Sequence, residues 1–168
     1  DSQNIFIYYF HKPDDMKKVT MLTTAIISLI LCAFLFVEDD PANGFLSSLN
    51  SDQLAKAQYD FESKDRFRWH YLPATSFERP GISLKELDSK QKSLVFDLLK
   101  ANMSKSGYDK TLNVIDLENV LAQTENDKER RDPEKYHIAI FGDPGDKTWA
   151  WSFQGHHVAL HFTISGGQ

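Results

Sequence analysis

The stretch from residue 149 to residue 164 constrains the fold more than any other part of the chain. It carries two of the three tryptophans and three of the six histidines, and large apolar side chains alternate along it with small or polar ones. Successive side chains of a strand point to opposite faces, so the pattern predicts a β-hairpin with one buried face. With Gln154-Gly155 as a two-residue turn, Ser152 would lie opposite His157.

The two faces of this predicted hairpin differ in character. The large apolar face must be buried, whereas the small residues around His157 on the other face would leave room for a ligand, a water or an ion. A bulge at Gly155 within one longer strand is the alternative, and it also separates His156 from His157. The large face carries Trp149, Trp151, Phe153, Val158, Leu160, Phe162 and Ile164, and the small face carries Ala150, Ser152, His157, Ala159, His161 and Thr163.

His156 and His157 are the candidate catalytic residues, and His157 is the candidate ligand of a divalent metal. His157 and His161 would be about 13 Å apart along a strand, too far to hold one ion together. A metal site would therefore need ligands from other segments. If the pair is functional, we expect His157 to contact the ligand and His156 to hold the turn. The alternative is that both are ordinary histidines of the sheet.

The rest of the chain predicts an α+β fold, with a helical hairpin packed on an antiparallel sheet that ends in a β-meander. Helices are expected near residues 51–58, 89–102 and 104–123, from capping residues and one-sided apolar spacing. Strands are expected at 136–141 and, from the alternation of aromatic and basic residues, at 66–71. If residues 136–141 pair with 149–153, His137 joins His157 and His161 on the small face.

Several polar side chains are candidates for binding a small-molecule ligand. Arg66 and Arg79 would hold an anionic group, although surface charge or an ion pair is the simpler explanation for each. Ser152 lies on the small face beside the histidines. Glu118 and Glu125 are candidate acids, but solvated helix positions are the default interpretation for both.

The N-terminal part predicts export. Residues 16–18 are a methionine and two lysines, residues 21–37 form an unbroken apolar run, and three acidic residues come directly after it. This order is typical of a secretory signal peptide. We therefore divide the chain into an upstream extension at 1–15, a signal peptide at 16–37 and a single, incomplete domain at 38–168, exported to the periplasm or the medium. The alternative is an uncleaved membrane anchor, with residues 21–37 as its contact with the membrane.

The composition argues against one class of binding partner, nucleic acids. The chain has a formal net charge of −5, with 19 basic and 24 acidic residues, and the basic residues form no stripe interleaved with aromatic ones. A nucleic-acid surface is therefore not expected. Cys32 is the only cysteine and lies in the apolar run, so a cleaved chain would depend on core burial rather than on disulfides.

Several short motifs are spread along the chain: Arg66-x-x-Trp69-x-Tyr71-x-Pro73, Arg79-x-Gly81, Ser106-Gly107-Tyr108, Leu117-Glu118, Arg131-Asp132-Pro133 with Tyr136, Phe141-Gly142, Trp149-x-Trp151 and Gly155-His156-His157. Together they resemble a bacterial family known as domain of unknown function 3500. The resemblance covers residue 45 to the end, and it implies an exported protein of which this chain is the N-terminal half. It supplies no activity, so two hypotheses stand: a metal-dependent enzyme that uses the Gly-His-His motif, or a non-catalytic exported protein that binds a ligand or partner.

Overall fold

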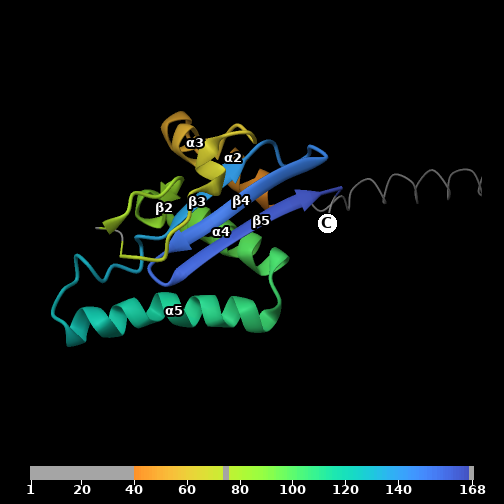
Figure 1. Cartoon of the computed structure of the whole chain (residues 1–168). Helices are drawn as coiled ribbons and strands as arrows, with labels where there is room; N and C mark the ends of the chain where they lie inside the picture. The colour runs from red at the N-terminus through yellow and green to blue at the C-terminus, as the bar shows by residue number, and fades with distance from the viewer. Residues whose placement is uncertain (1–39, 74–75, 167–168) are drawn as a thin grey trace, which may run out of the picture. The chain divides into compact units, whose positions relative to one another are not determined.

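The computed structural model describes residues 40–73 and 76–166, and its helices and strands form an α+β fold, as predicted (Figure 1). The proposed extension at 1–15 and signal peptide at 16–37 lie outside the described residues. Within the described part of the chain, no helix is long and apolar enough to cross a membrane. The elements are α2 (Pro41–Ser47), α3 (Ser51–Ala57), β1 (Gln58–Tyr59), the 3₁₀ helix η1 (Lys64–Phe67), β2 (Ile82–Ser83), the 3₁₀ helix η3 (Leu84–Glu86), α4 (Ser89–Asn102), α5 (Lys105–Thr124), β3 (His137–Phe141), β4 (Thr148–Gly155) and β5 (Val158–Ser165).

The helices begin where side chains can cap their free N–H groups. Asp88 accepts a hydrogen bond from the backbone N–H of Gln91 at 2.8 Å, and the Gln91 side chain accepts from the N–H of Asp88 at 3.0 Å. This capping box starts α4. The Ser104 hydroxyl accepts from the N–H of Gly107 at 3.2 Å and starts α5. Observed bounds of α3, α4 and α5 agree with the predicted ranges to within one residue, whereas α2 was not predicted.

The sheet is mixed, because a short parallel strand joins the predicted antiparallel meander. Strands β3, β4 and β5 pair in sequence order and are antiparallel. Strand β1 pairs with β3 in parallel, and β2 pairs with β3 in antiparallel fashion. Both of these two-residue strands lie on the side of β3 away from β4, so the edges of β3 are covered on both sides.

The large apolar face of the hairpin is buried along β4, as predicted, and mostly half-buried along β5. Trp149, Trp151 and Phe153 are 3%, 1% and 0% exposed and belong to one cluster that includes residues of α2, α4 and α5. The Trp151 ring stacks on the Phe162 ring across the strand pair, with ring centroids 4.4 Å apart and planes inclined by 9°. Burying large aromatic surfaces of this kind is the main stabilising contribution in a domain of this size.

The predicted turn of the hairpin was wrong. Gly155 pairs with Val158, so the two loop residues are His156 and His157 rather than Gln154-Gly155. Ser152 consequently lies opposite His161 and not opposite His157. The register differs from the predicted one by four residues. Because four is an even number, the strand residues keep their predicted faces, while His157 leaves the small face for the tip.

Part of the small face is covered by a loop, which corrects two further expectations. Residues 66–71 form no strand: Arg66 and Phe67 are the last residues of η1, and residues 68–71 run as irregular backbone beside this face. The Gln154 side chain is fully buried and donates to the carbonyl oxygen of Arg68 at 3.2 Å, while its own oxygen accepts from the N–H of His70 at 3.2 Å. The small residues of this face near Gln154 therefore make room for loop backbone, and a cavity of about 310 Å³ remains farther along it, lined by residues that include Arg66, Ala150 and His161.

Replacing Gln154 with Leu tests the importance of this contact. Leu has a similar volume but leaves the Arg68 carbonyl and the His70 N–H without partners. We expect the free energy of unfolding to fall by about 1–3 kcal/mol. The measurement is urea denaturation, with Gln123→Leu as the control because Gln123 is exposed on α5. Equal stability of the two variants would show that the loop is not held by Gln154.

Candidate functional site

The tip of the β4–β5 hairpin carries both candidate histidines, and its backbone is held by two tyrosines. His157 has a left-handed conformation, with φ of 60°, which histidine adopts more readily than most residues with a side chain. Its N–H donates to the carbonyl oxygen of Tyr71 at 2.8 Å. The Tyr136 hydroxyl donates to the carbonyl oxygen of His156 at 2.8 Å. A Cβ on Gly155 would lie 2.1 Å from the Tyr136 ring, so this position requires glycine.

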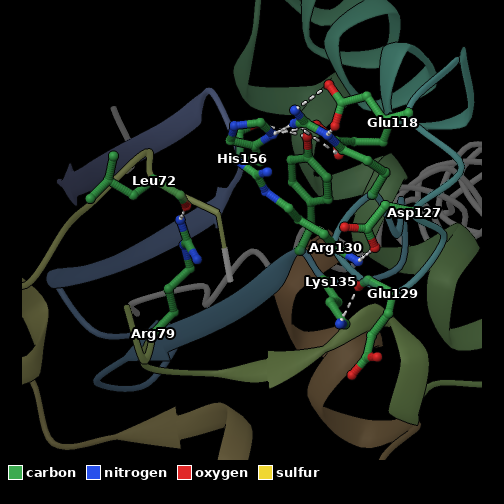
Figure 2. A network of polar contacts seen from close by, with 11 residues as sticks. Leu72, Arg79, Glu118, Asp127, Glu129, Arg130, Lys135 and His156 are labelled. Atoms are coloured by element: carbon green, nitrogen blue, oxygen red, sulfur yellow. Dashed lines mark hydrogen bonds and ion pairs between the residues drawn. The ribbon is translucent and has the colours of Figure 1, made fainter. Parts of the chain in front are cut away.

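A buried carboxylate lies against the first of these histidines (Figure 2). Nδ1 of His156 is 2.5 Å from Oε1 of Glu118, which lies on α5, and the two side chains are 11% and 3% exposed. An ionised carboxylate in such a place is costly unless it is paired and hydrogen-bonded. Arg131 supplies the opposite charge: its Nη1 is 3.9 Å from Oε2 of Glu118 and 3.0 Å from Nδ1 of His156. Arg131 is itself held by two hydrogen bonds to Glu125, at 2.8 and 2.9 Å.

This arrangement favours one tautomer of the His156 ring. An ionised carboxylate only accepts hydrogen bonds, so Glu118 at 2.5 Å favours a proton on Nδ1, whereas the guanidinium of Arg131 only donates, so its Nη1 at 3.0 Å favours a lone pair there. The contact with Glu118 is the shorter of the two and favours the proton on Nδ1. The lone pair of the neutral ring is then on Nε2. No hydrogen bond to Nε2 occurs among the residues described. A buried acid that orients a histidine through Nδ1, with Nε2 free, is the arrangement by which histidine accepts a proton from a substrate or water.

His157 lies beside this ring but is exposed. The centroids of the two imidazole rings are 3.9 Å apart, with planes inclined by 34°. Partial burial, and then the neighbouring His156, lower the pKa of His157 below its ordinary value. His157 is therefore neutral at pH 7 and can accept or donate a hydrogen bond at the surface. The His156 side chain is largely buried and its Nδ1 has a partner, and the functional roles of both residues remain predictions.

Arg79 lies next to the tip, and its hydrogen bonds are made to backbone carbonyl oxygens. Its Nη2 donates to the carbonyl oxygens of His70 at 3.0 Å and Gly155 at 3.1 Å, and also to that of Leu72 (Figure 2). The side chain is 6% exposed, and burial lowers the pKa of the guanidinium. In this position Arg79 ties the loop at residues 70–72 to the histidine turn, and its predicted role in holding an anion is not tested.

The other two predicted ligand-binding residues lie away from the tip. Nε of Arg66 donates to the carbonyl oxygen of Phe61 at 2.7 Å, and its guanidinium lies 4.1 Å from the centroid of the Phe61 ring. Ser152 is buried in β4, opposite His161, and its hydroxyl is 3.3 Å from Nε2 of Gln154. The structure thus brings His156 and His157 together, but it does not bring Arg66 or Ser152 to them.

The residues that complete the site were not selected from the sequence. From the sequence, Glu118 is a candidate acid whose default interpretation is a solvated helix position, and Arg131 and Tyr136 occur only within the family motifs. A signal for Glu118 was present: it falls at helical spacing between Ile115 and Ala122, and these three residues form part of the buried stripe of α5. An acidic residue in such a stripe must have a partner inside the protein.

Metal binding needs more ligands than the tip provides. Within residues 40–73 and 76–166, no three or more His, Cys, Asp and Glu side chains are placed to hold one ion. Glu118, the carboxylate nearest to the histidines, is occupied by His156. His157 alone is exposed and neutral, and one imidazole does not make a zinc site. The described residues therefore do not fit a complete metal centre.

Comparison with known proteins gives one match. No curated protein and no solved structure matches the chain. The profile of a family described as "Protein of unknown function (DUF3500)" matches residues 39–168, which include every residue of the histidine tip and of its Glu118–Arg131 support. The match covers well over half of the chain, and the protein therefore belongs to the DUF3500 family.

Proposed function

We propose that this protein is an exported enzyme in which His156 is the general base and His157 contacts the substrate. The observation that carries the proposal is the 2.5 Å contact between Nδ1 of His156 and the buried carboxylate of Glu118. A fixed tautomer is useful to a base because Nε2 then always presents its lone pair. A non-catalytic binding protein, the alternative from the sequence, gains nothing comparable from a buried acid behind His156.

The chemistry that this geometry supports is proton abstraction from a water or a hydroxyl group. Nε2 of His156 would take the proton. The negative charge of Glu118, 2.5 Å from Nδ1, would stabilise the imidazolium so formed, against the repulsion of the Arg131 guanidinium 3.0 Å from the same atom. Arg131 and its bidentate partner Glu125 keep the carboxylate in place. The exposed, neutral ring of His157 would donate a hydrogen bond to the substrate or accept one from it.

A metal-dependent form of this proposal would need ligands beyond those described. His157 is the residue of the tip that could contribute one, through a neutral imidazole nitrogen. A bound divalent ion would polarise the attacked group or lower the pKa of a water. Metal analysis of the purified protein decides between the two forms.

The test of the proposal is turnover of a panel of carboxyl ester, phosphoester and glycoside substrates by the wild type and two variants. His156→Gln keeps an N–H donor for Glu118 but removes the base, so we expect turnover to fall by about 100-fold or more. His161→Gln, which removes a histidine from the small face, should keep wild-type turnover. Unchanged activity of His156→Gln, or no turnover of the panel by the wild type, would contradict the proposal and favour the binding protein.

Export is the second part of the proposal and rests on residues 16–40. The two lysines before an apolar run and the acidic residues after it favour translocation of the chain downstream of the run. We expect a fusion of residues 16–40 to a reporter that is active only outside the cytoplasm to be active. Removal of the segment from the mature reporter would indicate a signal peptide, and its retention a membrane anchor. An inactive reporter fusion would contradict export.

A further inference from the structure

A cleft on the small-face side of the sheet has a charge opposite to that of the chain. It has a volume of about 980 Å³ and lies among α3, β1, β2 and the loops before β2 and β3. Four basic side chains line it, against two acidic ones, Glu78 and Glu86, which leaves an excess of two positive charges in a chain of formal net charge −5. The basic residues are Lys56, Lys85, Arg79 and Lys135.

The lysines of the cleft differ in how well they are neutralised. Lys56 is paired with Glu86, and Nζ of Lys85 lies 3.0 Å from Oδ2 of Asp132. Lys135 instead donates to the backbone carbonyl oxygen of Glu129 at 2.5 Å (Figure 2). A carbonyl oxygen carries no net charge, so among the described residues the ammonium group of Lys135 has no anionic partner. It is the cation of the cleft most available to a ligand.

Two nitrogen atoms in the wall of the cleft are buried and make no well-formed hydrogen bond to the described residues, although a backbone contact with Lys135 acts to raise the pKa of His137. They are Nε of Arg79 and Nδ1 of His137. Burial, and then the nearby Arg79, lower the pKa of His137 to about 4, so the ring is neutral at pH 7. Unpartnered buried polar atoms are rare in folded proteins and commonly mark a place where water, an ion or a ligand binds. Both atoms belong to residues that line the same cleft.

We propose that this cleft binds a small anionic molecule through a phosphate or carboxylate group, with Lys135 and Lys85 as its main contacts. A concave site of this size fits a small metabolite rather than a bare ion. Lysine ammonium groups bind phosphate and carboxylate oxygens through charge-assisted hydrogen bonds. The cleft shares Arg79 with the support of the histidine tip but contains neither His156 nor His157. Its occupancy is measured by binding alone, so failure of this proposal would leave the proposed activity of His156 untouched.

The test is isothermal titration of the purified protein with inorganic phosphate, pyrophosphate and citrate at constant ionic strength. We expect saturable binding of at least one of these anions. Tighter binding of pyrophosphate would indicate a phosphate ligand, and tighter binding of citrate would indicate a carboxylate ligand. Lys135→Ala should weaken that binding by about tenfold, because it removes one charge-assisted hydrogen bond. Lys110→Ala, which makes the same change of charge on α5 outside the cleft, should not.

Two controls show whether weaker binding could result from a misfolded variant rather than from a lost contact. Circular dichroism melts check that Lys135→Ala is folded, and Lys85→Ala provides a second variant on another segment of the cleft. We expect NMR signals of His137 and Lys135 to shift with the bound anion, because both residues line the cleft. Absence of saturable binding, or equal weakening by the Lys135 and Lys110 substitutions, would overturn the proposal.

Discussion

The contact between Glu118 and His156 is the interaction on which the candidate site depends. It joins the middle of α5 to the tip of the β4–β5 hairpin, two segments that are 38 residues apart in the chain. A carboxylate that is 3% exposed would be strongly destabilising without partners. Its partners are an imidazole N–H and the guanidinium of Arg131, which comes from the loop after α5. Helix, loop and hairpin are thus positioned together by one buried charge.

The other side of the tip is held by backbone hydrogen bonds rather than by charges. Arg79 and the N–H of His157 bind carbonyl oxygens of residues 70–72 and of Gly155. Gln154 binds the same loop at Arg68 and at His70. The tip is therefore fixed from the helix side and from the loop side. Such rigidity is what a site needs if a proton acceptor is to stay in one orientation.

Much of the fold could be predicted from the sequence because helix caps and two-residue alternation are local signals. The helices at 51–57, 89–102 and 105–124 and the burial of Trp149, Trp151 and Phe153 follow from them. The turn could not be placed correctly, because Gln154-Gly155 resembles a turn while Gly155 is needed for its contact with the Tyr136 ring. The expected strand at 66–71 failed because its alternation is not one of buried and exposed residues: Phe67 and Trp69 are 67% and 57% exposed.

The site was harder to predict than the fold because its parts meet only through tertiary packing. The sequence identified the histidine pair, but it gave no reason to join Glu118 and Arg131 to it. The most direct measurement of this account is the tautomer of His156, observed by ¹⁵N NMR at neutral pH in the wild type. The account predicts the proton on Nδ1, hydrogen-bonded to Glu118, with Nε2 unprotonated in the neutral ring. A neutral His156 with its proton on Nε2 would contradict it.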